Sequence, residues 1–73
     1  MSSKRLLTQR GHEVHVALFH CMGGQMSARL YVLRQDDGMH VFARPYGPCT
    51  IAHRRAVIQW ALELGESWIS ENC

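Results

Sequence analysis

The stretch EVHVALFHC, residues 13–21, decides the fold class, because apolar and mixed side chains alternate along it. Val14, Val16 and Leu18 fall on one face of an extended chain, and the residues between them fall on the other. This period of two is typical of a strand that has one buried face. The sequence therefore predicts a β-strand at this position.

Two further alternating stretches, residues 27–34 and 39–44, predict two more strands. Gly23-Gly24 separates the first strand from the second and is a turn signal. Asp37-Gly38 separates the second from the third and favours a two-residue hairpin loop of type I′. The three strands are therefore expected to form an antiparallel meander.

The expected hairpin loop fixes a register for the last two strands. With Asp37-Gly38 as the loop, Leu33 lies opposite Phe42 and Tyr31 lies opposite Arg44. Directly paired residues share a face of the sheet. All four side chains are therefore expected on the outer face, away from the apolar set.

A long helix is expected after the strands. Pro45-Tyr46-Gly47-Pro48 is expected to end the third strand, and Thr50 suits a helix N-cap. The helix is predicted from Ile51 to about Ser70. Gly65 costs ~1 kcal/mol inside a helix relative to alanine, so we expect it to let the helix lie close to the sheet. The apolar stripe centres on Val57, Ala61, Leu64 and Trp68.

The first eleven residues are polar and basic. Ser3 to Arg10 could form a short helix stopped by Gly11, and a frayed tail is the alternative. The predicted fold class is α+β: a three-stranded antiparallel β-meander with one long C-terminal helix packed on one face. Residues 1–11 form the tail or short helix, and residues 12–73 form a single domain.

A chain of 73 residues has room for one modest core and little room for a deep substrate pocket. We therefore expect a protein that binds a partner, not an enzyme, and no cofactor. The net charge of +2 permits an anionic partner without requiring one. The sequence has three cysteines without a CxxC pair and shows no signal-peptide pattern, which favours a cytoplasmic protein. It has no apolar run of about 18 residues, so we expect no membrane partner.

The outer face of the sheet is the first candidate site, because it mixes aromatic, aliphatic and basic side chains. Rings and guanidinium groups suit nucleic acid, by stacking on bases and contacting phosphates, and they suit a protein partner equally well. The alternatives are sheet-to-sheet dimerisation and a lid formed by Leu6 and Leu7. The expected partner-binding residues are Phe19, Arg29, Tyr31, Leu33, His40, Phe42 and Arg44.

The start of the predicted helix is the second candidate site. His53, Arg54 and Arg55 stand in its first turn and a half, where cations oppose the helix dipole and free amides favour an anion. The trio is expected to bind a phosphate or carboxylate; the alternative is three solvated charges.

The wide apolar arc of the helix also favours a homodimer.

Neither a metal site nor nucleophilic catalysis is expected. The histidines and cysteines show no structural-zinc spacing, and His12 and His15 point to opposite faces of a strand. Cys49 and His53 are close in sequence at the helix start, but nucleophilic catalysis also requires a cleft and an oxyanion site.

With residues 3–10 helical, the order helix, three strands, helix resembles the double-stranded-RNA-binding domain. That family carries lysines at the start of its last helix, where this chain has Ile51-Ala52-His53-Arg54-Arg55. The sheet and helix also resemble the arm-binding domains of phage integrases and small phage-borne inhibitors such as anti-CRISPR proteins. The mixed outer face and the small size of the domain favour an inhibitor or adaptor, borne by a phage or mobile element, that docks on a protein or nucleoprotein complex. The alternative is a nucleic-acid-binding module that uses the same face and the basic helix start.

Overall fold

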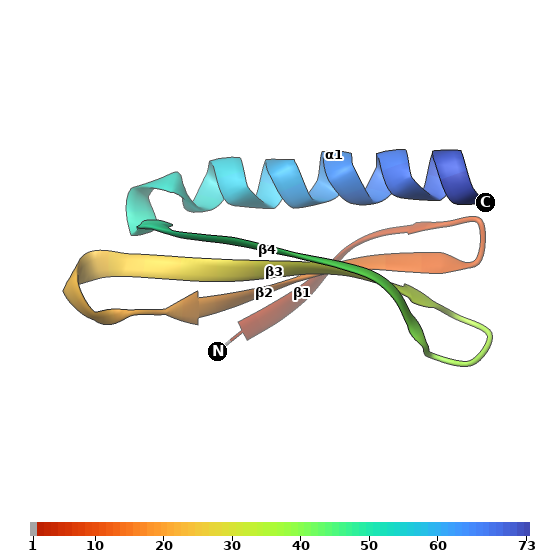
Figure 1. Cartoon of the computed structure of the whole chain (residues 1–73), viewed down its shortest axis with the longest axis horizontal. Coiled ribbons are helices and arrows are strands. Elements are labelled where there is room, and N and C mark those ends of the chain that lie inside the picture. The colour runs from red at the N-terminus through yellow and green to blue at the C-terminus, as the bar shows by residue number, and fades with distance from the viewer. Residues whose placement is uncertain (1) are drawn as a thin grey trace.

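The computed structural model describes residues 2–73, in which four antiparallel strands form one sheet and a long helix packs on it (Figure 1). The strands follow one another across the sheet in chain order. The α+β class and the C-terminal helix are therefore confirmed, but the sheet has four strands where the sequence predicted three. The elements are β1 Ser2–Gln9, β2 His12–His20, β3 Gln25–Arg34, β4 His40–Thr50 and α1 Arg54–Asn72, with short 3₁₀ turns at Met22–Gly24 and Ile51–His53.

The unexpected strand is β1, which stands where a tail or short helix was predicted. It pairs antiparallel with β2. Arg10 (φ 50°) and Gly11 (φ 72°) connect the two strands, and both have the left-handed backbone that a type I′ turn requires. Gly11 therefore signals a hairpin, not the end of a helix, and the N-terminal helix of the double-stranded-RNA-binding domain has no counterpart in residues 2–73.

Leu6 and Leu7 belong to β1 and pack against the core. They do not form a lid over the outer face, because β1 lies beside β2 at the edge of the same sheet. The lid expected as an alternative is therefore wrong.

The connection between β3 and β4 has five residues, 35–39, and not the expected two. The Arg34 amide donates to the Met39 carbonyl over 2.9 Å, and the Gly38 amide donates to the Arg34 carbonyl over 2.7 Å. Among residues 2–73, Arg10 is the only non-glycine residue with a positive φ. Asp37 therefore lacks the backbone conformation of a type I′ turn.

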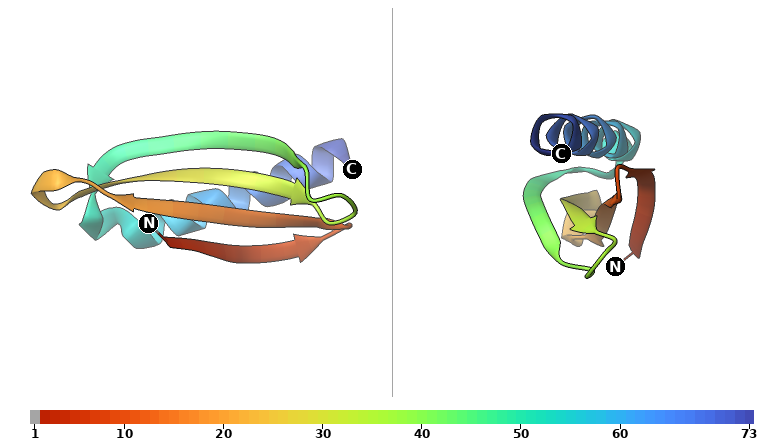
Figure 2. Two further views of the ribbon diagram at one scale, coloured as in Figure 1. Left: turned by 90° about the horizontal axis from the view of Figure 1, so that it is seen from below. Right: turned by 90° about the vertical axis from the view of Figure 1, so that its right-hand side faces the viewer.

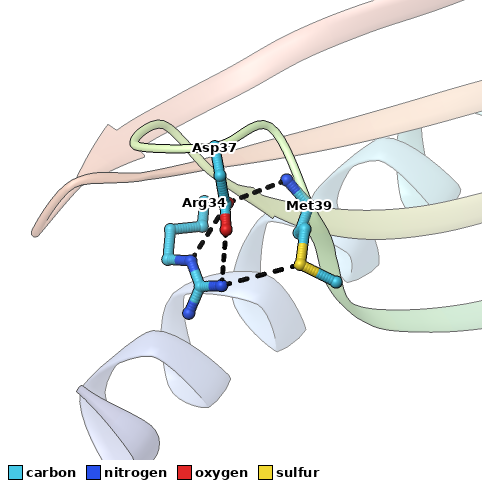
Figure 3. A network of polar contacts seen from close by, with 3 residues as sticks. All are labelled: Arg34, Asp37 and Met39. Carbon is cyan, nitrogen blue, oxygen red and sulfur yellow. Dashed lines mark hydrogen bonds and ion pairs between the residues drawn. The ribbon is translucent and has the colours of Figure 1, made fainter.

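The Asp37 carboxylate stabilises this longer loop (Figure 3). It accepts hydrogen bonds from the Arg34 guanidinium over 3.1 Å and 2.7 Å, and from the Met39 amide over 3.1 Å. These bonds, the one from Arg34 above all, hold the pKa of Asp37 down at about 2. These contacts favour the longer loop, because in it the Asp37 carboxylate bonds to both the Arg34 guanidinium and the Met39 amide.

The loop and a bulge change the register of β4. Val32 lies opposite Phe42, and Leu30 lies opposite Arg44, with Val41 as the extra residue of the bulge. A shift of one residue moves every side chain of a strand to the opposite face. Phe42 and Arg44 therefore lie on the helix side of the sheet, and their expected placement on the outer face is wrong.

The observed register packs two aromatic rings of β4 against α1. The ring centroids of Phe42 and Trp68 are 5.4 Å apart, and those of Tyr46 and Trp60 are 4.8 Å apart. Four residues of a strand span about 13 Å and eight residues of a helix span about 12 Å, so the two pairs match in spacing. Packing these large rings contributes more than packing Ala43, which the expected register placed there.

The strand β4 continues through Pro45-Tyr46-Gly47-Pro48, where the sequence predicted its end. It lies at an edge of the sheet, and an edge strand tolerates proline because a missing amide need not break a ladder bond.

The helix α1 begins at Arg54, three residues later than expected, because a 3₁₀ turn follows Thr50.

The core lies between α1 and the apolar face of β2 and β3. A β-carbon on Gly65 would lie 2.5 Å from Cγ1 of Val14, which confirms that glycine is needed for this close approach. The buried hydrophobic side chains of the core cluster are Val14, Val16, Leu18, Met26, Ala28, Leu30, Val32, Val57, Ala61 and Ile69.

Candidate functional site

The face of the sheet opposite α1 is not covered by any other element of residues 2–73, and we call it the open face (Figure 2, left). It carries five of the seven expected partner-binding residues; Phe42 and Arg44 are the two exceptions. The larger side chains of the open face are Arg5, Glu13, His15, Phe19, Arg29, Tyr31, Leu33 and His40.

A row of rings crosses the middle of the open face. The Tyr31 ring stacks on His15, with centroids 5.3 Å apart and planes at 5°, and lies 4.7 Å from the His40 ring. Because β3 lies between β2 and β4, the two imidazoles flank the tyrosine on opposite sides. Both faces of the Tyr31 ring are therefore occupied within the protein, and its edge is what remains for a partner.

Glu13 anchors one end of this row. Its carboxylate lies 2.9 Å from Nε2 of His15 and accepts a hydrogen bond from the Gln35 amide over 3.1 Å. The bond to His15, and then the bond to Gln35, lower the pKa of Glu13. The ring row is thus held in place by charge-assisted and stacking contacts.

Phe19 and Arg29 lie toward the end of the open face where α1 begins. Phe19 is half-buried, whereas Arg29 is exposed between Ala17 of β2 and Pro45 of β4. Within residues 2–73, Arg29 forms no ion pair with a carboxylate. This part of the face therefore offers an aromatic ring and an unpaired guanidinium on neighbouring strands.

The basic start of α1 borders an open pocket of about 380 Å³. Arg54 and Arg55 line it from α1, and Lys4 lines it from β1. Ala52 and Ile58 supply apolar surface beside the cations. The pocket thus gathers three positive charges from two elements that are far apart in the sequence.

Sequence reasoning placed His53 in this site and missed Lys4. The His53 ring does not line the pocket, and its Nδ1 is hydrogen-bonded to the Thr50 hydroxyl over 2.7 Å. Lys4 joins Arg54 and Arg55 only because β1 pairs with β2 underneath the helix start. No local pattern in the sequence signals that meeting.

The charges of the protein separate along its long axis, which measures 39 Å. Residues 2–5, 16–29 and 44–60 contain no Asp or Glu, and we call the part of the molecule that they form the acid-free half; it includes the starts of β1 and α1 (Figure 1). This half holds six of the eight Lys and Arg residues, and all six acidic residues lie elsewhere. The cations are Lys4, Arg5, Arg29, Arg44, Arg54 and Arg55; the acids are Glu13, Asp36, Asp37, Glu63, Glu66 and Glu71.

This separation matters more than the net charge of +2. Screening at physiological salt acts over about 8 Å, far less than the 39 Å long axis, so a partner responds mainly to the charges near it. The positive end of the α1 dipole lies in the acid-free half and adds to its potential. A partner at this half therefore meets a mainly cationic surface, and of its six cations Arg5 is the one that lies near a carboxylate, that of Glu13.

Cys49 and His53 do not form the pair considered from the sequence. The His53 ring is hydrogen-bonded to the Thr50 hydroxyl, and Cys49 packs against the core. Instead, Cys73 Sγ lies 3.6 Å from Nε2 of His12, at the other end of the molecule. In the described part of the chain, no group of three or more His, Cys, Asp or Glu side chains is placed to hold a metal ion.

Comparison of the chain with protein-family models, curated proteins and solved structures gives no match. Over residues 2–73, no helix has both the length and the apolar character needed to cross a membrane. The features of the molecule that bear on its function are therefore the open face, the basic pocket and the distribution of charge.

Proposed function

We propose that the protein is a non-enzymatic binding protein that holds a single-stranded nucleic acid on its acid-free half. The observation that carries the proposal is the separation of charge, with six cations and no carboxylate in residues 2–5, 16–29 and 44–60. Contacts between cations and phosphates supply essentially all of the affinity of non-specific nucleic-acid binding. A polyanion is therefore the partner that this half complements.

Two surfaces of the acid-free half are available to one strand. On the open face, Arg5 and Arg29 supply guanidinium groups and Phe19 supplies a ring. Lys4 and Arg5 are consecutive in the edge strand β1, so their side chains point to opposite faces of the sheet. Cations thus line both sides of the β1 edge, and a flexible strand can contact both.

Fluorescence anisotropy with short single-stranded DNA and RNA, over a series of salt concentrations, tests this proposal. We expect the affinity to fall steeply with salt, because bound phosphates release counterions. Arg5→Gln and Arg29→Gln are each expected to reduce the slope of log affinity against log salt by about 0.7, the value for one lost phosphate contact.

Arg10→Gln is the matched control, because it removes the same charge from an exposed position outside the acid-free half. We expect it to leave the slope unchanged. Absence of binding at low salt would contradict the proposal. So would a loss of affinity in Arg10→Gln equal to that in Arg29→Gln.

Docking on a protein through the open face, as an inhibitor or adaptor, is the second candidate, and the ring row favours it. Since His15 and His40 occupy both faces of Tyr31, this ring is not free to stack on a base. A tyrosine edge beside Leu33 suits a protein interface, where an apolar body and a polar hydroxyl are both used.

Photocrosslinking from position 31 separates the two candidates. A protein captured there, then purified and found to bind the wild type but not Tyr31→Ala, would support docking on a protein. Equal binding to both forms would contradict it. Sedimentation of the isolated protein reports whether it binds a second copy, and a dimer that Tyr31→Ala dissociates would place that copy on the open face.

A further inference from the structure

The pocket between β1 and α1 combines three positive charges without a nearby negative one. Lys4, Arg54 and Arg55 line the same space of about 380 Å³, and no Asp or Glu lines it. Within residues 2–73, none of the three forms an ion pair with a carboxylate. The charge of this pocket is therefore left for a ligand to balance.

This charge matches a phosphate monoester better than the diester of a nucleic-acid backbone. A monoester carries about −1.5 to −2 charges at pH 7 and has three strong acceptor oxygens. A backbone phosphate carries about one negative charge. Each arginine can pair with two oxygens at once, and Lys4 adds a compact point charge. Two arginines and a lysine thus supply donors for all three oxygens of a monoester.

The pocket has room for more than a phosphate group. Its volume of about 380 Å³ lies within the range of roughly 300–1,000 Å³ of small-ligand sites. Ile58 and Ala52 provide apolar surface against which a sugar or base can pack. A terminal nucleotide, with its phosphate on the cations, has this combination of charge and apolar surface.

We infer that the pocket of Lys4, Arg54 and Arg55 binds the terminal phosphate monoester of a nucleic-acid strand. This inference rests on the proposed function, because it places the end of the strand whose backbone contacts the acid-free half. Arg5, next to Lys4 but on the open face, lies on the path from the pocket to that face. The protein accordingly prefers a phosphorylated strand end to an internal stretch.

The test uses oligonucleotides of one sequence that carry a 5′-phosphate, a 3′-phosphate or hydroxyls at both ends. We expect one phosphorylated form to bind on the order of tenfold more tightly at low salt, since three exposed ion pairs contribute roughly twofold each. Lys4→Gln and Arg55→Gln are each expected to reduce this preference about twofold, and the double variant about fourfold. Arg29→Gln, the control, is expected to weaken all three oligonucleotides equally and to leave the preference intact.

The outcomes separate this inference from the proposed function. Salt-dependent binding with equal affinity for all three ends would overturn the terminal-phosphate site and leave nucleic-acid binding in place. A preference that the double variant Lys4→Gln/Arg55→Gln leaves unchanged would also overturn the inference, because the phosphate would then bind elsewhere. Failure of every oligonucleotide to bind would overturn both.

A second measurement does not depend on strand binding. Addition of adenosine monophosphate is expected to shift the backbone-amide NMR signals of Arg54, Arg55 and Ile58, whereas adenosine is expected to leave them in place. Equal shifts with both compounds, or no shift with either, would contradict a site for a phosphate monoester.

Discussion

Phe42 of β4 stacks on Trp68 of α1, with ring centroids 5.4 Å apart and planes at 20°. The Arg44 guanidinium carbon lies 4.7 Å from the centroid of the same Phe42 ring. The contact between Phe42 and Trp68 ties the edge strand β4 to the helix. It is available only in the register that turns Phe42 toward α1.

Phe42→Ala is expected to lower the free energy of unfolding by about 2 kcal/mol, roughly half the loss for a fully buried phenylalanine, because Phe42 is half-buried. Urea denaturation measures the change. Ala43→Ser, on the open face next to it, should alter stability by less than about 0.5 kcal/mol. If Phe42→Ala leaves the free energy of unfolding unchanged, the result would contradict the observed register and favour the one expected from the sequence.

Gly65→Ala is expected to destabilise the protein even though alanine favours helix. The substitution gains ~1 kcal/mol of helix propensity, but the new methyl group would lie 2.5 Å from Cγ1 of Val14. Overpacking typically costs about 1–3 kcal/mol, so we expect a net loss of about 1 kcal/mol.

The double variant Val14→Ala/Gly65→Ala should lose less stability than the two single losses added together, because the new methyl group occupies the space that Val14 leaves. The three variants are compared by thermal and urea denaturation. Strict additivity would mean that Gly65 and Val14 do not contact each other in solution.

The β3–β4 loop is expected to depend on pH through Asp37. Its pKa falls from an ordinary 3.8 to about 2, because the carboxylate accepts hydrogen bonds from Arg34 and from the Met39 amide. The contribution of this carboxylate to stability is therefore fully present above pH 4, and it is lost as the pH falls through about 2. An NMR titration of the Asp37 side chain, with Asp37→Asn as the variant that cannot ionise, measures this. A midpoint near the ordinary value would contradict the observed loop.

Arg10→Asn is expected to stabilise the β1–β2 hairpin by about 0.5 kcal/mol. Arg10 has φ 50°, a left-handed conformation that asparagine adopts at lower cost than arginine. Gly11→Ala should lose about 1 kcal/mol, because Gly11 also has a positive φ. Thermal unfolding compares both with the wild type, and a stabilising Gly11→Ala would argue against the type I′ turn.

Local sequence pattern was enough to predict the central strands, the long helix and the role of Gly65. These features depend on periodicity within one stretch, which reports the buried face of a strand or helix directly. The same patterns placed Phe19, Arg29, Tyr31, Leu33 and His40 on one face of the sheet, as observed. In the basic pocket, they identified Arg54 and Arg55.

Tertiary structure alone decided the strand β1, the register of β4 and the meeting of Lys4 with Arg55. Asp37-Gly38 resembles a type I′ turn in sequence, but the hydrogen bonds of the Asp37 carboxylate and the packing of Phe42 on Trp68 select a longer loop. The acid-free half likewise exists only in the folded chain, since its cations come from three separate stretches. Strand pairing and helix packing sum energies over residues distant in the sequence, and for that reason local periodicity does not reveal them.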